Sequence, residues 1–253
     1  ITSGDDDITI SGSNNEATVT ISDNDTSELS INDITVDESA GTATFTITTT
    51  LENSQDITVN WATQNGTAIS GDDYTAGGGT ATITAGQTST TIAITILEDV
   101  LDEIDETFNV NLSSPANAVI TDATGVGTIL DNDDAPTISL ASTSLSIDED
   151  AGTVTVTVNL SAASGQPVYF DYATSNGDAV SGSDYTSTSG TATIPAGTTT
   201  YDIVIPITDD NIDEINETFN VVLSNPQNTS ISGGSTATVT ILDNEPQQRY
   251  ERM

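Results

Sequence analysis

Hydrophobic and polar residues alternate along most of the chain in short bursts. From Val154 to Val158 each second residue is valine and the residues between are threonine, and Ile203, Ile205 and Ile207 alternate with other residues in the same way. A period of two places successive side chains on opposite faces of an extended strand. Gly, Pro, Asn and Ser clusters interrupt the bursts, and no helical pattern occurs between them. The pattern predicts an all-β fold, an Ig-like antiparallel β-sandwich of about seven strands.

The alternating pattern and its loops occur twice. Asp73 in Gly-Asp-Asp-Tyr-Thr returns 111 residues later as Asp184 in Gly-Ser-Asp-Tyr-Thr, and Asp99 returns at the same interval as Asp210. The sequence Ile-Leu-Asp-Asn-Asp at 129–133 returns as Ile-Leu-Asp-Asn-Glu at 241–245. Self-similarity at one fixed interval indicates copies of a single domain. We therefore predict two β-sandwiches in tandem.

The same alignment sets the expected domain boundaries. Residues 26–134 form the first predicted domain and residues 135–245 the second, with hardly a spare residue between them. Residues 1–25 match only the last strand of such a domain, so we interpret them as the remnant of a preceding repeat. Residues 246–253 have no strand pattern and are interpreted as a C-terminal tail.

Composition narrows the class of function. The chain has 39 acidic residues against two basic ones, no His and no Cys, and a formal net charge of −37. Nucleic acids and anionic membranes need Lys and Arg to neutralise their phosphates, so both are excluded as partners. No apolar run approaches the roughly 20 residues that cross a bilayer, and no membrane insertion is expected within this segment.

Catalysis is also disfavoured by the residue types present. A nucleophile and its base would require His, Cys or Lys, and the chain has none of them. A glycosidase pair formed by Glu98 and Glu103 is the remaining alternative, but the pair is repeated in both copies, which indicates a structural role. We predict that the chain is not an enzyme.

The acidic residues gather in particular loops. Successive strands of a sandwich run up and down alternately, so the first, third and fifth loops share one pole with the end of the last strand. In the second copy these places carry acidic residues at 148–150, 184, 209–217 and 243–245, and the loops of the other pole carry none. Carboxylates about 4 Å apart repel by roughly 4 kcal/mol at an effective dielectric near 20, so such a cluster needs a cation. Oxygen donors without His or Cys favour Ca²⁺ over Mg²⁺ and transition metals. A solvated acidic surface is the alternative, and it would spread charge over the exposed strands.

Four short motifs follow in the same order in each copy: Asp-Glu-x-Ala-Gly, Gly-x-Asp-Tyr, Asp-Glu-x-x-Glu-Thr-Phe, and Ile-Leu-Asp-Asn followed by Asp or Glu. This series resembles the Calx-beta domain across both copies. The resemblance implies calcium as the bound ion, with ligands carried over by position onto Glu38, Asp73, Glu98, Asp99, Glu103, Asp131 and Asp133, and onto Glu149, Asp184, Asp209, Asp210, Glu214, Asp243 and Glu245. Asn132 and Asn244 stand where an exchanger domain has an acidic residue, which leaves the number and affinity of the ions open.

The resemblance also suggests a setting. Calx-beta domains occur in tandem arrays of large bacterial surface proteins and in the cytoplasmic calcium-sensing region of sodium/calcium exchangers. The heavy use of Thr and Ser and the absence of Lys favour the first setting, so we expect a secreted or cell-surface bacterial protein in which the repeats form a calcium-stiffened stalk or adhesin segment. Neighbouring repeats and protein or carbohydrate surface ligands are the further partners expected. A pair of regulatory calcium-sensor domains, as in the exchangers, is the alternative.

Overall fold

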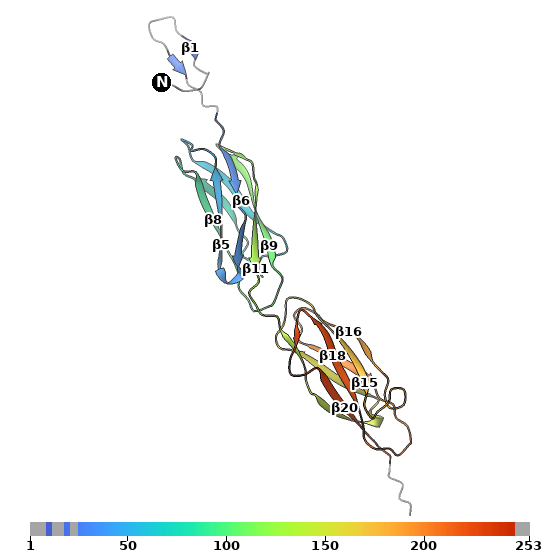
Figure 1. The fold of residues 1–253 in the computed structure, drawn as a ribbon. Helices are drawn as coiled ribbons and strands as arrows, with labels where there is room; N and C mark the ends of the chain where they lie inside the picture. Colours follow the sequence, from blue (N-terminus) through green and yellow to red (C-terminus); the bar gives the residue numbers. More distant parts are fainter. Residues whose placement is uncertain (1–8, 12–17, 21–24, 246–253) are drawn as a thin grey trace, which may run out of the picture. The chain divides into compact units, whose positions relative to one another are not determined.

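The computed structural model describes residues 9–11, 18–20 and 25–245 (Figure 1). The chain separates into two compact units, one formed by Ile1–Leu97 and Glu106–Ile129, the other by Glu98–Asp105 and Leu130–Met253. Near the N-terminus β1 (Thr9–Ser11) pairs with β2 (Thr18–Thr20) in antiparallel orientation. The proposed remnant at residues 1–25 lies mostly outside the described residues, and the proposed tail at 246–253 lies entirely outside them.

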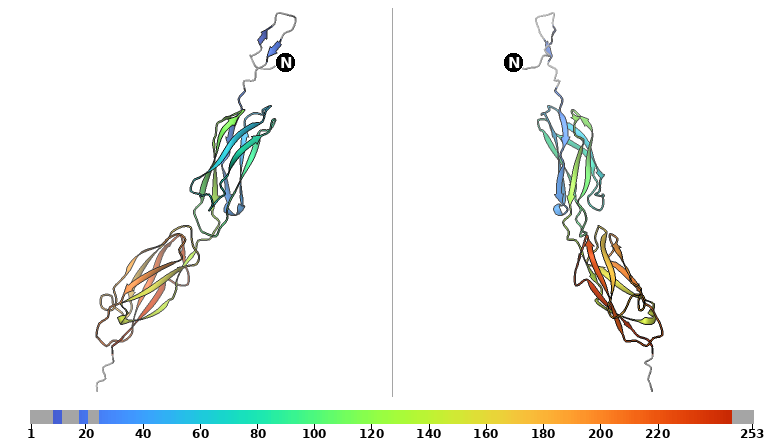
Figure 2. Two further views of the ribbon diagram at one scale, coloured as in Figure 1. Left: turned by 180° about the vertical axis from the view of Figure 1, so that it is seen from behind. Right: turned by 45° about the vertical axis from the view of Figure 1, so that its right-hand side comes forward.

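The first repeat folds into two β-sheets, whose strands can be followed in the two views of Figure 2. The two sheets enclose one hydrophobic core. One sheet has the order β10-β3-β5-β8 and the other the order β4-β11-β9-β6-β7. The strands are β3 (Glu28–Ile31), β4 (Ile34–Asp37), β5 (Thr42–Thr49), β6 (Ile57–Asn65), β7 (Gly78–Ile83), β8 (Ser89–Thr95), β9 (Glu106–Ala116), β10 (Val119–Ile120) and β11 (Thr124–Leu130). A short 3₁₀ helix, η1 (Glu38–Ala40), follows β4.

The second repeat has the same architecture strand for strand. Its sheets have the orders β17-β14-β12-β19 and β13-β20-β18-β15-β16. The strands are β12 (Thr137–Leu140), β13 (Ser144–Asp148), β14 (Thr153–Leu160), β15 (Val168–Asn176), β16 (Ser189–Ile194), β17 (Thr200–Pro206), β18 (Glu217–Gln227), β19 (Ser230–Ile231) and β20 (Thr236–Leu242), with the 3₁₀ helix η2 (Glu149–Ala151) after β13. The predicted all-β fold of tandem sandwiches is confirmed.

The first predicted strand of each repeat is divided between the two sheets. In the second repeat β12 pairs with β14, and after residues 141–143 the chain crosses over so that β13 pairs with β20. The β13 and β20 strands run parallel, with Ile147 opposite Ile241 and Asp148 opposite Leu242. This division, with the two-residue β19, gives nine strands where the alternation indicates about seven. Because the pairing is parallel, the loop after β13 and the chain after β20 leave the sheet at the same end.

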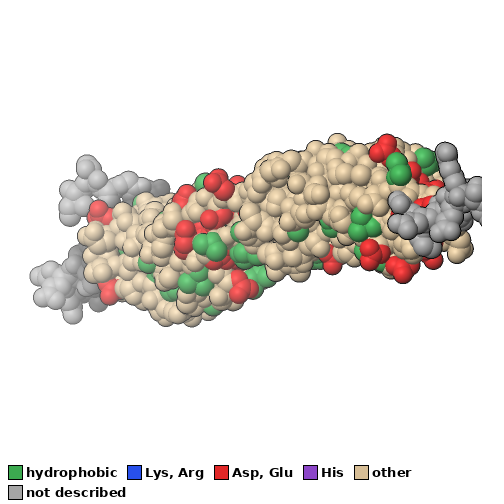
Figure 3. Space-filling model, turned by 90° about the horizontal axis from the view of Figure 1, so that it is seen from below, with side chains coloured by type: hydrophobic (Ala, Val, Ile, Leu, Met, Phe, Trp, Pro, Cys, Tyr) green, Lys and Arg blue, Asp and Glu red, His purple; other side chains and the backbone are tan. Residues whose placement is uncertain are grey.

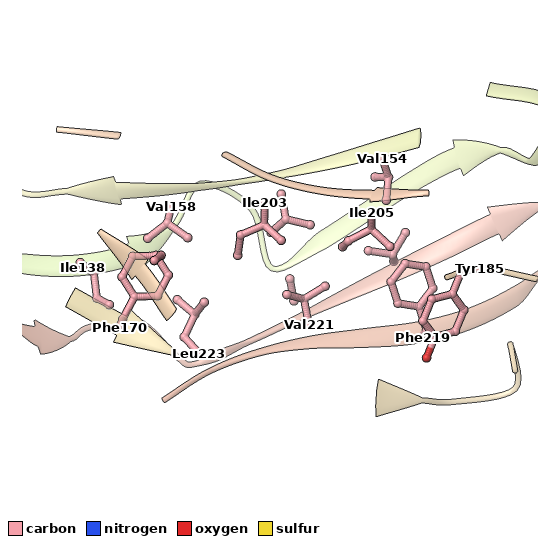
Figure 4. Packing of buried hydrophobic residues seen from close by; sticks show 14 of the residues in the cluster. Ile138, Val154, Val158, Phe170, Tyr185, Ile203, Ile205, Phe219, Val221 and Leu223 are labelled. Carbon is pink, nitrogen blue, oxygen red and sulfur yellow. The ribbon is translucent and has the colours of Figure 1, made fainter. Parts of the chain in front are cut away.

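The core of the second repeat is built from the inward residues of both sheets (Figure 4). Tyr185 stacks on Phe219 with ring centroids 4.2 Å apart, and its hydroxyl donates a 2.6 Å hydrogen bond to Asn176 Oδ1. The same Asn176 oxygen accepts the amide of Ser181. Full burial of a side chain of this size contributes about 1.5–3 kcal/mol. Tyr185 therefore fixes the loop between β15 and β16, which carries the neighbouring Asp184.

Candidate metal centre

Two groups of carboxylates form at one pole of the second repeat. The first joins Glu149 of η2 to Asp243 and Glu245 after β20, and the second joins Asp184, Glu214 and Glu217. Within each group one carboxylate oxygen from every residue lies within 4.8 Å of those of the other two. The parallel pairing of β13 with β20 brings the first group together. The second group combines the loop that Tyr185 anchors with the segment before β18 and the first residue of β18.

Hydrogen bonds from the backbone hold these carboxylates in place. The Val180 amide donates to Asp184 Oδ2 at 2.6 Å, and the Glu214 amide donates to Asp243 Oδ1 at 3.0 Å. The second bond ties the loop after β17 directly to the end of β20. Each donor satisfies only part of the lone-pair capacity of a carboxylate, so oxygen atoms remain available as ligands.

The electrostatic state of the pole is that of crowded, partly desolvated acids. Glu149 is only 5% exposed, and burial raises its pKa, with a further rise from the charges of Glu245, Asp210 and Glu214. Burial likewise raises the pKa of Glu214, and the charges of Asp184, Asp210 and Asp243 add to the effect. Residues of both carboxylate groups line one small pocket, which is formed by Glu149, Asp184, Glu214, Ile215, Glu217, Ile241 and Asp243.

Two more side chains show the same effect. Burial raises the pKa of Glu217, and a hydrogen bond with Asp184 raises it further. Burial also raises the pKa of Glu245, followed by the charges of Asp243 and Asp209. All four glutamates therefore have pKa values raised by desolvation and by the neighbouring acidic groups.

The donor set fits a hard cation. Glu245 Oε2 is buried and has no hydrogen-bond partner among the described residues, an arrangement that costs about 1–3 kcal/mol or more unless a ligand compensates. Each group offers carboxylate oxygens without nitrogen or sulfur donors. Ca²⁺ accepts six to eight oxygen ligands in flexible geometry, whereas transition metals favour imidazole or thiolate. The residues present are therefore suited to calcium.

The remaining sequence-predicted ligands of the second repeat surround these groups. The Asn244 side-chain amide donates to Asp209 Oδ1 at 3.3 Å, and the Ile212 amide donates to Asp210 Oδ1 at 2.7 Å. Asp210 also donates a backbone hydrogen bond to the Glu149 carboxylate. Asp209 and Asp210 thus lie beside the two groups without belonging to either, and they stay predicted ligands. Glu217 is the residue absent from the sequence-based ligand set, although it is the third acid of the Asp-Glu-x-x-Glu motif and that spacing is its signal.

The sequence-predicted ligands of the first repeat are distributed over both units. Glu38 lies in η1 and is 7% exposed, and Asp73 accepts the Ile69 amide within the first unit. The other predicted ligands lie in the second unit, on two segments: Glu98, Asp99 and Glu103 on Glu98–Asp105, and Asp131 and Asp133 just after Leu130.

Those two segments are joined to each other within the second unit. The Glu103 amide donates to Asp131 Oδ1 at 3.2 Å, and the Asn132 side chain donates to Glu98 Oε2 at 3.3 Å. Burial raises the pKa of Asp131, and the charges of Asp102 and Asp133 contribute to the rise. Asp133 Oδ2 is buried without a hydrogen-bond partner among the described residues, as Glu245 Oε2 is in the second repeat.

The distribution of charge over the surface agrees with these groups. On the face drawn in Figure 3 the acidic side chains occur in groups separated by wide uncharged areas. Among the described residues no helix is long and apolar enough to pass through a membrane. Such grouping of the acidic side chains differs from the even spread that a purely solubilising charge would have.

Comparison with known proteins places the chain in a family. It is 32% identical over 160 residues to Extracellular matrix protein 3 of Lytechinus variegatus, covering 59% of this chain and 5% of that protein. It is 29% identical over 214 residues to Sodium/calcium exchanger 1 of Felis catus, covering 75% of this chain and 22% of that protein. The chain thus spans less than a quarter of the length of either relative.

Solved structures and family models give the last observation. The crystal structure of CBD12 from CALX1.2 matches with a TM-score of 0.42 at 20% identity, over 85% of this chain and 99% of that chain. The Calx-beta domain model matches residues 20–129 and again residues 131–245. The two matches of the family model cover most of the sequence and both sandwiches, and the chain therefore belongs to the Calx-beta domain family.

Proposed function

We propose that both repeats bind Ca²⁺ at their acidic poles and serve as structural modules of a secreted or cell-surface protein. The observation that carries the proposal is the group of Glu149, Asp243 and Glu245. In this group a buried carboxylate lies close to two others, and Glu245 Oε2 has no hydrogen-bond partner in the part of the chain that the structure describes. A divalent cation offsets the repulsion and completes the ligation of that oxygen. No residue of the group requires a chemical reaction to explain its placement, and the proposal includes no catalytic activity.

The extracellular role is supported by composition and by one relative. Extracellular matrix protein 3 is an extracellular relative by its name, and the chain itself contains no Cys or Lys. External calcium modules need only weak sites, because they are saturated at roughly 10⁻⁴ to 10⁻³ M Ca²⁺. In that setting calcium would stiffen the junction of successive repeats and give a bacterial surface protein a stalk or adhesin segment.

The second candidate is a regulatory calcium sensor, favoured by the similarity to Sodium/calcium exchanger 1. A sensor needs sites that respond in the range of roughly 10⁻⁷ to 10⁻⁵ M. The two functions therefore differ by one to several orders of magnitude in affinity, while the same residues serve both.

Isothermal titration calorimetry of the whole chain with Ca²⁺ and with Mg²⁺ tests the proposal. We expect saturable binding of Ca²⁺ with dissociation constants near 10⁻⁴ M and much weaker binding of Mg²⁺. Constants below about 10⁻⁵ M would favour the sensor. An absence of calcium binding up to several millimolar would refute both candidates. Small-angle scattering with calcium and with chelator then tests stiffening, which requires a narrower distribution of long distances in calcium.

A further inference from the structure

The loop between β14 and β15 of the second unit contains a buried polar residue, Ser164. Its side chain is 1% exposed, and its Oγ lies 3.2 Å from the Asp102 carbonyl oxygen and 3.3 Å from Asp102 Oδ2, both acceptors for the hydroxyl. The Gly165 amide donates to the same Asp102 carbonyl at 3.0 Å. The Gln166 amide donates to Ser164 Oγ and closes the turn. This turn, residues 164–166, contacts the segment Glu98–Asp105 and is called the contact turn below.

Gly165 lies close against the Glu103 side chain. A Cβ atom at position 165 would lie 2.2 Å from Glu103 Oε1 and 2.5 Å from Glu103 Cγ. Contacts below 3.0 Å are not observed for real Cβ atoms, so any other residue at 165 must displace the Glu103 side chain. Glycine at this position therefore lets a predicted calcium ligand keep its place.

The first repeat provides a matched comparison for the contact turn. Asn53 occupies the position of Ser164, and its Oδ1 accepts the Gln55 amide in the same kind of turn. The residue equivalent to Gly165 is Ser54, which is exposed, and its loop lines an open pocket with Asp25 and Ser27. The turn itself is therefore common to both repeats, and the glycine occurs only where an acidic segment rests on it.

The second repeat provides the matched comparison for the segment. Leu101, Asp102 and Glu103 are partly buried, whereas the equivalent Ile212, Asp213 and Glu214 are exposed, Ile212 to 59%. Both segments make the same bond to the residue that follows the last strand of the repeat: the Glu103 amide donates to the Asp131 carboxylate, and the Glu214 amide donates to the Asp243 carboxylate. Asp102 and Glu103 contact Ser164 and Gly165, and this contact contributes to their burial.

We propose that Ser164 and Gly165 are positioning residues for the calcium ligands of the first repeat. They hold Asp102 and Glu103 in place before the ion binds, and the Glu103 amide in turn orients the Asp131 carboxylate. Ligands fixed in advance bind more tightly, because less conformational entropy is lost on binding. A loop without any acidic residue thereby sets the affinity of an acidic cluster. The proposal rests on calcium binding as the proposed function.

Gly165→Ala is the direct test, because one methyl group displaces the Glu103 carboxylate. Calcium is titrated in an Asp243→Asn background, which weakens the acidic cluster of the second repeat so that binding at the cluster of the first repeat is observed. The double variant Asp131→Asn/Asp243→Asn, with both clusters weakened, gives the baseline. We expect about a 10-fold weaker calcium affinity, the lower end of the effect of removing outer-shell support from a metal ligand. Ser54→Thr, which adds one methyl at the equivalent position of the first repeat, should leave the affinity unchanged.

Two further measurements separate positioning from simple damage. In an Asp131→Asn background, binding at the acidic cluster of the second repeat is observed, and Gly165→Ala should leave that affinity unchanged. A loss of affinity there would mean that the substitution damages the fold of the second repeat. In a Glu103→Ala background, the Glu103 atoms that the methyl group would meet are absent, so Gly165→Ala should have little additional effect. If Gly165→Ala and the Asp243→Asn chain from which it is made bind calcium equally well at the acidic cluster of the first repeat, the proposal is overturned, while calcium binding itself remains supported. If the wild-type chain binds no calcium, the proposed function fails first and this inference fails with it.

Discussion

Glu149→Gln should stabilise the second repeat in chelator and remove most of its response to calcium. The Glu149 carboxylate is 5% exposed and lies within 4.8 Å of an oxygen of Asp243 and of Glu245. At that distance each pair of charges repels by roughly 3.5 kcal/mol at an effective dielectric near 20. Solvent screening around the partly exposed Asp243 and Glu245 relieves part of this cost, so the net gain on removing one charge should be about 1–3 kcal/mol. The new amide also offers a donor to Glu245 Oε2.

The assay follows from the amino-acid composition. Trp61, the one tryptophan of the chain, lies in the first repeat, so its fluorescence follows the first repeat and far-UV circular dichroism follows both. With about 4 °C per kcal/mol for a domain of this size, the second transition should rise by about 4–12 °C in chelator. Calcium at 100 times its dissociation constant should add about 2.7 kcal/mol per site to the wild type and little to the variant.

Asp202→Asn is the control in the same repeat. Asp202 is exposed on β17, accepts the Thr157 hydroxyl at 2.6 Å, and carries the same single charge. Its loss should change stability by less than about 0.5 kcal/mol beyond the lost hydrogen bond, and equally with or without calcium. The Trp61 transition should stay in place for both variants. Two results would contradict this prediction: a lower melting temperature of the second repeat of Glu149→Gln in chelator, or an unchanged stabilisation of the variant by calcium. Either result would mean that Glu149 is not a repelled carboxylate that a bound ion stabilises.

Three further predictions concern ions, residues and pH. Thermal melts should show strong stabilisation by Ca²⁺ and weak stabilisation by Mg²⁺, and superimposable melts in Ca²⁺, Mg²⁺ and chelator would contradict a metal site. Asp99→Ala should weaken calcium binding in calorimetry, whereas Asp122→Ala, at an exposed residue between β10 and β11, should not; equal losses would mean that bulk charge is responsible. In chelator, stability should increase as pH falls from 7 toward the ordinary carboxyl value of about 4.3, because the raised folded-state pKa values of Glu149, Glu214 and Glu245 make the folded chain bind protons before the unfolded chain does. In saturating calcium the trend should reverse as protons compete with the ion, so denaturation curves with the same pH slope in both conditions would refute it.

Much of the fold follows from local pattern because burial in a sandwich has a period of two. Phe170 and Phe219 lie on the apolar phase of their strands, and both are fully buried. The crossing of the first strand between sheets also has a signal in the sequence. The apolar phase falls on even positions at Ile138 and shifts to odd positions at Leu145 and Ile147, where the strand joins the other sheet. A shift of phase within one burst thus marks a strand that changes sheets.

The acidic pole could be predicted for a similar reason. Loop parity depends only on the number of strands between two loops, so it brings Glu149 and Asp243 to one end whatever the loop conformations are. Which carboxylates meet within that end depends on backbone geometry that parity does not contain. Glu217 joins Asp184 and Glu214, while Asp209 is bonded to Asn244 outside the groups.

Differences between the two copies carry information that neither copy has alone. Asp213 and Asp102 occupy the same place in similar motifs, yet Asp213 is exposed, whereas Asp102 is partly buried and accepts a hydrogen bond from Ser164, more than sixty residues away. No local pattern reports such a contact. The difference between Ser54 and Gly165, in two turns of the same kind, agrees with that contact, since the backbone at Gly165 lacks the positive φ that would by itself favour glycine. In a tandem array, a glycine that interrupts the repeat at an ordinary backbone conformation therefore indicates where another part of the chain approaches.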